Sequence, residues 1–226
     1  MSKMYVPLKA VIFDLDGTLI NSAIPFKEMK IKIITFFQAK GVTFGLLNEN
    51  LLNFEIVKLA VNNLQEKGFS RRQITKILSQ VSEIMNEVEL QSIDNASLIE
   101  DAAKILNYLK LRGLRLGVMT RSCHEYAQKI LTKFGLDKFF DALAARDDVS
   151  QPKPNPEHAF YLLNLLGVKA EETLFIGDCW SDAECASQAK LRFVFVGRTK
   201  ETAKVHELGY KNIDSLNDLI NIIETA

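Results

Sequence analysis

The chain has 226 residues, of which 47% are hydrophobic and 25% charged, a composition typical of a folded globular protein. Its 28 basic residues balance its 28 acidic residues, which argues against nucleic acid as a partner. The three cysteines form no C-x-x-C pair, and no apolar run is long enough for a signal peptide or a membrane span. We therefore expect a cytoplasmic protein that does not associate with membranes.

Short apolar segments alternate with helical patterns along much of the chain. Helix boundaries are marked by a capping box from Ser97 to Glu100, by Pro156 with Gly167, and by Ser215. Strands separated by helices indicate parallel crossovers in an open α/β sheet. The expected strands are residues 10–13, 114–119, 141–144, 173–176 and 192–196.

The segment from residue 22 to residue 92 interrupts this alternation. It shows apolar residues at helical spacing in three stretches, the third opened by a Ser70–Gln73 capping box, and no clear strand. We expect a small helical subdomain over 22–92, inserted into a core formed by 1–21 and 93–226. Its loop 40–45 is a candidate for substrate selection or a plain connector with Phe44 in the subdomain core.

Two carboxylates follow the first expected strand, in the sequence Asp14-Leu-Asp-Gly-Thr-Leu. Alternation along a strand lets Asp14 and Asp16 face the same side, and Gly17 lets the chain turn away sharply. Carboxylates at the end of a buried strand need compensation, for which a divalent cation is suited. A solvated acidic turn is the alternative when this motif is taken alone.

Three further groups of polar residues follow later strands. Thr120 and Arg121 could bind phosphate oxygens at a helix start, although a threonine there is also an ordinary cap. Lys153 lies among three prolines that limit its freedom, and Asp178 and Asp182 bracket the turn after the fourth strand. All of these positions meet at the carboxyl edge of the sheet, where ligands bind in open α/β folds.

These motifs, in this order, resemble the haloacid dehalogenase superfamily, most closely its phosphoglycolate phosphatase-like members. The resemblance spans residues 10–196 and implies a Rossmann-like parallel sheet of order 3-2-1-4-5 with a small all-α cap. It also implies phosphatase activity, and we expect a small phosphorylated metabolite as substrate because the cap is small and the site deep. One departure is Arg121, at a position where many relatives carry asparagine, which puts the detailed phosphate contacts in doubt.

The resemblance also assigns roles to individual residues. Asp14 would be the nucleophile and Asp16 the proton donor and acceptor, with Lys153 holding Asp14. Thr120 and Lys153 would bind the phosphoryl oxygens, and Arg121, beside Thr120, is a further candidate for substrate binding. Mg²⁺ would be held by Asp14, by Asp178 and by the main-chain carbonyl of Asp16, with Asp182 close to the metal.

Other activities of the same fold remain open. A dehalogenase would not need Asp16, because a halide leaving group takes no proton. A phosphonatase would need an amine in the cap, for which Lys27 and Lys30 are available. A phosphomutase would use the same core residues, and a non-catalytic binding module would be expected to lose a catalytic carboxylate or the lysine.

Overall fold

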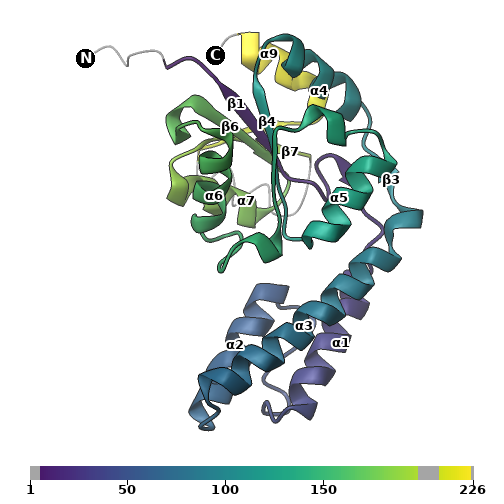
Figure 1. The fold of residues 1–226 in the computed structure, drawn as a ribbon, viewed down its shortest axis with the longest axis vertical. Coiled ribbons are helices and arrows are strands. Elements are labelled where there is room, and N and C mark those ends of the chain that lie inside the picture. The colour runs from purple at the N-terminus through teal and green to yellow at the C-terminus, as the bar shows by residue number, and fades with distance from the viewer. Residues whose placement is uncertain (1–5, 198–208, 225–226) are drawn as a thin grey trace. The chain divides into compact units, whose positions relative to one another are not determined.

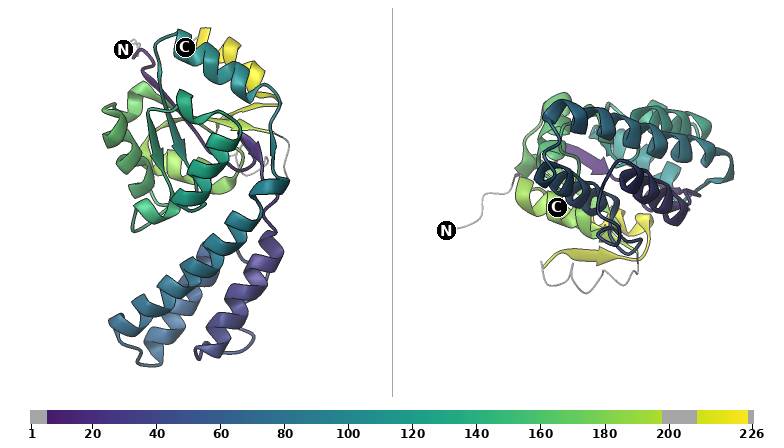
Figure 2. Two further views of the ribbon diagram at one scale, coloured as in Figure 1. Left: turned by 45° about the vertical axis from the view of Figure 1, so that its right-hand side comes forward. Right: turned by 90° about the horizontal axis from the view of Figure 1, so that it is seen from below.

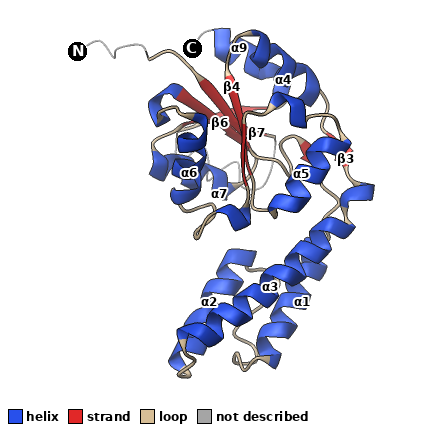
Figure 3. Cartoon of the chain, in the orientation of Figure 1, coloured by secondary structure: helices blue, strands red, loops and turns tan. Residues whose placement is uncertain are grey.

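The computed structural model describes residues 6–197 and 209–224. The chain divides into two compact units, one formed by Met1–Ser22 with Asn95–Ala226 and the other by Ala23–Asp94. The first unit contains a parallel sheet between helices, and the second is helical (Figures 1 and 3). The predicted fold class is therefore confirmed. Within the described ranges no helix is long and apolar enough to cross a bilayer.

The central sheet has six strands in the order β5-β4-β1-β6-β7-β8, and every neighbouring pair is parallel. The five neighbouring strands β5-β4-β1-β6-β7 reproduce the predicted order 3-2-1-4-5. A sixth strand, which the sequence did not reveal, extends the edge beside β7. The strands are β1 (Ala10–Phe13), β4 (Arg115–Met119), β5 (Ala142–Ala144), β6 (Thr173–Gly177), β7 (Arg192–Val196) and β8 (Lys211–Ile213).

Helices cover both faces of this sheet (Figure 1). Helices α6 (Glu157–Leu166) and α7 (Trp180–Ala189) pack on one face, where their apolar residues form a core with Ala10 and Ile12. Because side chains alternate along a strand, the other residues of β1 point to the opposite face. That side carries α4 (Ala102–Leu111), α5 (His124–Lys133) and the short α9 (Leu219–Glu224). Burial on both faces explains why β1 is a continuous apolar run.

A two-stranded antiparallel ribbon corrects one helix prediction. Strand β2 (Ile20–Asn21) pairs with β3 (Ser97–Leu98), so the capping box predicted at Ser97 is wrong. The main-chain N–H of Ile99 donates to the carbonyl of Leu19 at 3.0 Å, and helix α4 begins only at Ala102. Pairing with a distant segment therefore satisfies main-chain groups that the local pattern would have placed in a helical turn.

The second unit consists of α1 (Phe26–Ala39), α2 (Asn53–Glu66) and α3 (Arg71–Gln91), and α1 contacts both other helices (Figure 2). The hydroxyl of Ser70 accepts the main-chain N–H of Gln73 at 3.4 Å, which confirms the predicted cap of α3. Many of the apolar residues at helical spacing are buried in this unit, among them Met29, Ile33, Phe37, Ile56, Ala60, Leu64, Ile77 and Val81.

The loop between α1 and α2 does not bury its aromatic residue. Phe44 is 88% exposed, so the reading that places it in the core of the helical unit is wrong. The loop is instead anchored by Thr43, whose main-chain N–H and hydroxyl both donate to the side-chain oxygen of Asn63, at 3.0 and 3.1 Å. Gly41 and Gly45 on either side have positive φ angles, which favour glycine.

Candidate active site

The register of the parallel sheet brings the predicted site residues to one edge. Phe13 of β1 lies opposite Val118 of β4 and Ile176 of β6. Asp14, the residue directly after β1, therefore emerges between the ends of the two neighbouring strands, and its main-chain N–H donates to the carbonyl of Ile176 at 2.8 Å. Thr120 and Asp178 follow just beyond the ends of those neighbouring strands.

Lys153 is the electrostatic centre of this edge. Its ammonium donates to Asp14 Oδ1 at 2.6 Å, to Asp182 Oδ1 at 2.6 Å and to the carbonyl of Met119 at 2.7 Å. These contacts engage all three protons of a side chain that is only 1% exposed. Burial alone would lower the pKa of Lys153, but the charges of Asp14 and Asp182 raise it instead. The lysine is thus held as a cation against the carboxylate at the end of β1.

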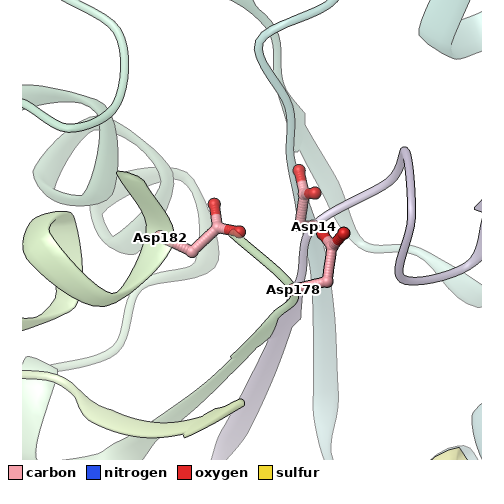
Figure 4. A group of neighbouring side chains, drawn as sticks. All are labelled: Asp14, Asp178 and Asp182. Carbon is pink, nitrogen blue, oxygen red and sulfur yellow. The ribbon is translucent and has the colours of Figure 1, made fainter. Parts of the chain in front are cut away.

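Three carboxylates, those of Asp14, Asp178 and Asp182, gather at this edge of the sheet (Figure 4). One oxygen each from Asp14, Asp178 and Asp182 lies within 4.8 Å of the others. Burial, followed by repulsion from Asp14, raises the pKa of Asp178 to about 8, and burial raises the pKa of Asp182 to about 6. Burial also raises the pKa of Asp14. A set of clustered, poorly solvated carboxylate oxygens with too little positive charge fits a hard divalent cation.

Two glycines allow these carboxylates to approach the main chain. A Cβ atom on Gly17 would overlap the carboxyl group of Asp178, and Gly17 has a φ of +92°, which side-chain-bearing residues rarely adopt. A Cβ atom on Gly177 would lie 2.5 Å from Asp182 Oδ2. That oxygen accepts the main-chain N–H of Cys179 at 3.1 Å, so Asp182 is fixed in the first turn of α7.

The carboxylate of Asp16 lies in a different environment from that of Asp14. It accepts hydrogen bonds from the hydroxyls of Ser122 at 2.7 Å, Tyr126 at 2.9 Å and Thr120 at 3.3 Å. Its side chain is not one of the three in the acidic cluster. Asp16 as a metal ligand through its main-chain carbonyl stays a prediction.

The two predicted phosphate-binding residues after β4 lie close to this network. Thr120 is 1% exposed, and its hydroxyl oxygen also accepts the main-chain N–H of Ser122 at 3.0 Å. Burial lowers the pKa of Arg121, and the negative charges of Asp182 and Asp14 counteract that effect. The guanidinium therefore lies within the electrostatic reach of the carboxylates around Lys153.

Sequence reasoning missed two residues that support the site. His158 of α6 accepts the main-chain N–H of Lys153 on Nδ1 at 3.2 Å, so its Nε2 carries the proton and donates to the carbonyl of Ala144 at 3.0 Å. Burial lowers its pKa to about 3, which keeps the ring neutral. Tyr126 is the second. Its position on the buried face of an amphipathic helix was the available signal, but that signal predicts packing and not a polar contact.

The family is decided by comparison with known proteins. The model of the haloacid dehalogenase-like hydrolase family matches residues 11–196. The chain belongs to this family. Relatives include the pyrophosphatase PpaX of Halalkalibacterium halodurans, 28% identical over 219 residues that cover 96% of this chain and 97% of that protein. A phosphoglycolate phosphatase of Yersinia pestis is 28% identical over 183 residues, covering 80% and 78% of the two chains.

Solved structures share the fold of this chain. A HAD-superfamily hydrolase from Ehrlichia chaffeensis superposes with a TM-score of 0.62 at 21% identity, covering 99% of this chain and 98% of that one. A β-phosphoglucomutase from Clostridium difficile gives 0.67 at 18% identity, covering 94% and 93%. The family predicted from the motifs is confirmed and the chain is a hydrolase of this family, whereas the role of each residue stays a prediction.

Proposed function

We propose that this hydrolase is a Mg²⁺-dependent phosphatase that cleaves a small phosphorylated metabolite through an aspartyl-phosphate on Asp14. The observation that carries the proposal is the buried contact of 2.6 Å between Lys153 and Asp14 at the carboxyl edge of the sheet. A carboxylate held by a fixed ammonium is oriented for attack, and the same ammonium neutralises negative charge that develops on a phosphoryl group.

The chemistry follows from the arrangement of the carboxylates. An oxygen of Asp14 attacks phosphorus while the bond from phosphorus to the leaving-group oxygen breaks. Asp16 gives its proton to that leaving oxygen and then takes a proton from water. This water attacks the phosphorus of the aspartyl-phosphate. The bond between phosphorus and the Asp14 oxygen breaks, and phosphate is released. Thr120, Arg121 and Lys153 bind the phosphoryl oxygens during both steps.

The acidic cluster provides the oxygen ligands for a metal. Asp14 and Asp178 would hold Mg²⁺ directly together with the main-chain carbonyl of Asp16, and Asp182 would remain close by, bound to Lys153. When bound, the ion supplies positive charge that offsets repulsion between the carboxylates and an anionic phosphate. Without the ion, the described charges at this edge are three carboxylates against the ammonium of Lys153 and the guanidinium of Arg121.

The substrate class comes from the relatives. Their names denote activity on pyrophosphate and on phosphoglycolate, which are both small anionic phosphates. We carry this class over to the present chain as part of the proposal. The phosphomutase reading uses the same core residues, and it differs in a measurable way because a mutase returns the phosphoryl group to its product and releases little free phosphate.

The test is release of inorganic phosphate from p-nitrophenyl phosphate, phosphoglycolate and pyrophosphate, with Mg²⁺ or with EDTA. We expect activity that requires Mg²⁺, disappears in Asp14→Asn and persists in Asp137→Asn, a matched change at an exposed aspartate. Mass spectrometry after an acid quench should find the phosphoryl group on the peptide that contains Asp14. Phosphate release that survives in Asp14→Asn, or a folded Mg²⁺-loaded enzyme that releases none from any of these substrates, would contradict the proposal.

A further inference from the structure

Both carboxylate oxygens of Asp16 accept hydrogen bonds from hydroxyl groups of the segment after β4. Tyr126 donates to Oδ1 at 2.9 Å, and Ser122 donates to Oδ2 at 2.7 Å. Thr120 adds a longer contact to Oδ2 at 3.3 Å. One donor on each oxygen fixes the rotation of the carboxyl group as well as its position.

Tyr126 is a rigid anchor for this contact. It lies in the first turn of α5, is 0% exposed, and is among the largest fully buried side chains of the described residues. Packing alone would be served equally well by phenylalanine. A buried phenol needs a partner for its hydroxyl, and here the ring carries that hydroxyl to Asp16 Oδ1.

We propose that Tyr126, together with Ser122, is a positioning residue that holds Asp16 where it can protonate the leaving group. This inference rests on the proposed phosphatase activity, in which Asp16 is the proton donor. Asp16 lies beyond the end of β1 and is only partly buried, so the strand does not fix its side chain. Proton transfer requires its oxygen to stay within hydrogen-bond reach of the leaving oxygen.

Hydroxyl groups suit this task on both sides of the proton transfer. A serine or tyrosine hydroxyl can accept a hydrogen bond from a protonated carboxyl group and donate one to a carboxylate. The same contacts with Ser122 and Tyr126 therefore hold Asp16 before and after it gives up its proton. A charged donor such as lysine would hold only the carboxylate and would oppose protonation.

The consequence is a dependence on the leaving group. A poor leaving group, such as the alkoxide of an alkyl phosphate, needs protonation as its bond to phosphorus breaks, whereas p-nitrophenolate does not. The ratio kcat/KM reports only steps up to departure of the leaving group and is independent of the later hydrolysis of the aspartyl-phosphate. Loss of the Tyr126 hydroxyl should thus lower kcat/KM for alkyl phosphates far more than for p-nitrophenyl phosphate.

The experiment measures kcat/KM of Tyr126→Phe for p-nitrophenyl phosphate, phenyl phosphate and glycerol phosphate. We expect a fall of roughly 10- to 100-fold with glycerol phosphate, part of the effect of a general acid, and less than about threefold with p-nitrophenyl phosphate. Ser122→Ala should show the same selectivity, and it carries the test if Tyr126→Phe is poorly folded by circular dichroism. Tyr161→Phe, on α6, is the matched control and should leave every ratio unchanged.

The outcomes separate this inference from the proposed function. Asp16→Asn should show the same selectivity in a stronger form. If it does and both Tyr126→Phe and Ser122→Ala reduce all substrates equally, the two hydroxyls are structural and the inference is overturned. If Asp16→Asn itself shows no selectivity, or the wild-type enzyme releases no phosphate, the proposed mechanism fails and this inference fails with it.

Discussion

Replacement of Asp178 by asparagine should stabilise the metal-free protein. Lys153 contacts Asp14 and Asp182 directly, whereas Asp178 accepts a hydrogen bond of 3.3 Å from the hydroxyl of Thr18. At a separation of 4.8 Å, two unit charges repel by about 3.5 kcal/mol when the effective dielectric constant is about 20. Attraction to Lys153 offsets part of the repulsion from the two neighbours, so we expect a net gain of ~1–3 kcal/mol in the free energy of unfolding.

The assay is denaturant unfolding of wild type and Asp178→Asn at about pH 9, where this carboxyl group is charged, in EDTA and in Mg²⁺. A ligand that binds only the folded state at roughly 100 times its Kd stabilises that state by about 2.7 kcal/mol. Mg²⁺ should therefore stabilise the wild type and have little effect on the variant. The difference in unfolding free energy between the two proteins should then become smaller than in EDTA, or change sign. Asp137→Asn is the control. A variant less stable than wild type in EDTA, or equal stabilisation of both by Mg²⁺, would refute the electrostatic reasoning.

Three other substitutions test the surroundings of the cluster. Lys153→Met leaves buried carboxylates without their cation, so we expect unfolding free energy to fall by about 3–5 kcal/mol and phosphate release by about 10²–10³-fold, measured by denaturation and steady-state kinetics. Gly17→Ala should lose about 1–3 kcal/mol more than Gly113→Ala in the same denaturation assay. Both glycines have positive φ, but only at Gly17 would the new Cβ meet another atom within 4 Å, so equal losses would contradict the steric argument. The folded-state pKa of His158 is lowered to about 3 from 6.5, so the unfolded chain binds the extra proton and stability falls as pH drops below about 6.5. Wild type should lose ~2 kcal/mol more than His158→Gln between about pH 7 and pH 5, measured by denaturation at each pH.

The sequence predicted the sheet well because local and long-range signals agree there. Residues 10–13 are apolar throughout, as a strand covered on both faces must be, and the structure places β1 at those same residues. Ser97 shows the opposite case. Its capping pattern is local, but pairing with residues near the other end of the helical unit decides its conformation. A single sequence carries no direct record of such pairing.

The site was predictable to the extent that it depends on strand ends. Asp14, Thr120 and Asp178 each follow a strand, so parallel topology brings them together whatever their side chains do. The partner of each side chain was not predictable in this way. Lys153 and Tyr126 reach the site from a proline-rich loop and a helix, and the contact each makes depends on how those elements pack on the sheet.

The two carboxylates of the first motif differ because other elements of the fold bring different partners to each. Asp14 lies between strand ends and contacts the ammonium of Lys153, which counteracts the rise in its pKa caused by burial and so favours the charged form that the proposed nucleophile needs. Asp16 lies two residues further on, against neutral hydroxyls that accept as readily as they donate, so its surroundings suit a group that gives up a proton and takes one back. A spacing of two residues at the end of one strand thus separates a carboxylate paired with an ammonium from one that accepts hydrogen bonds from hydroxyl groups. We infer that the proposed division of labour between nucleophile and proton donor depends on that difference in partners, because the two side chains are chemically identical.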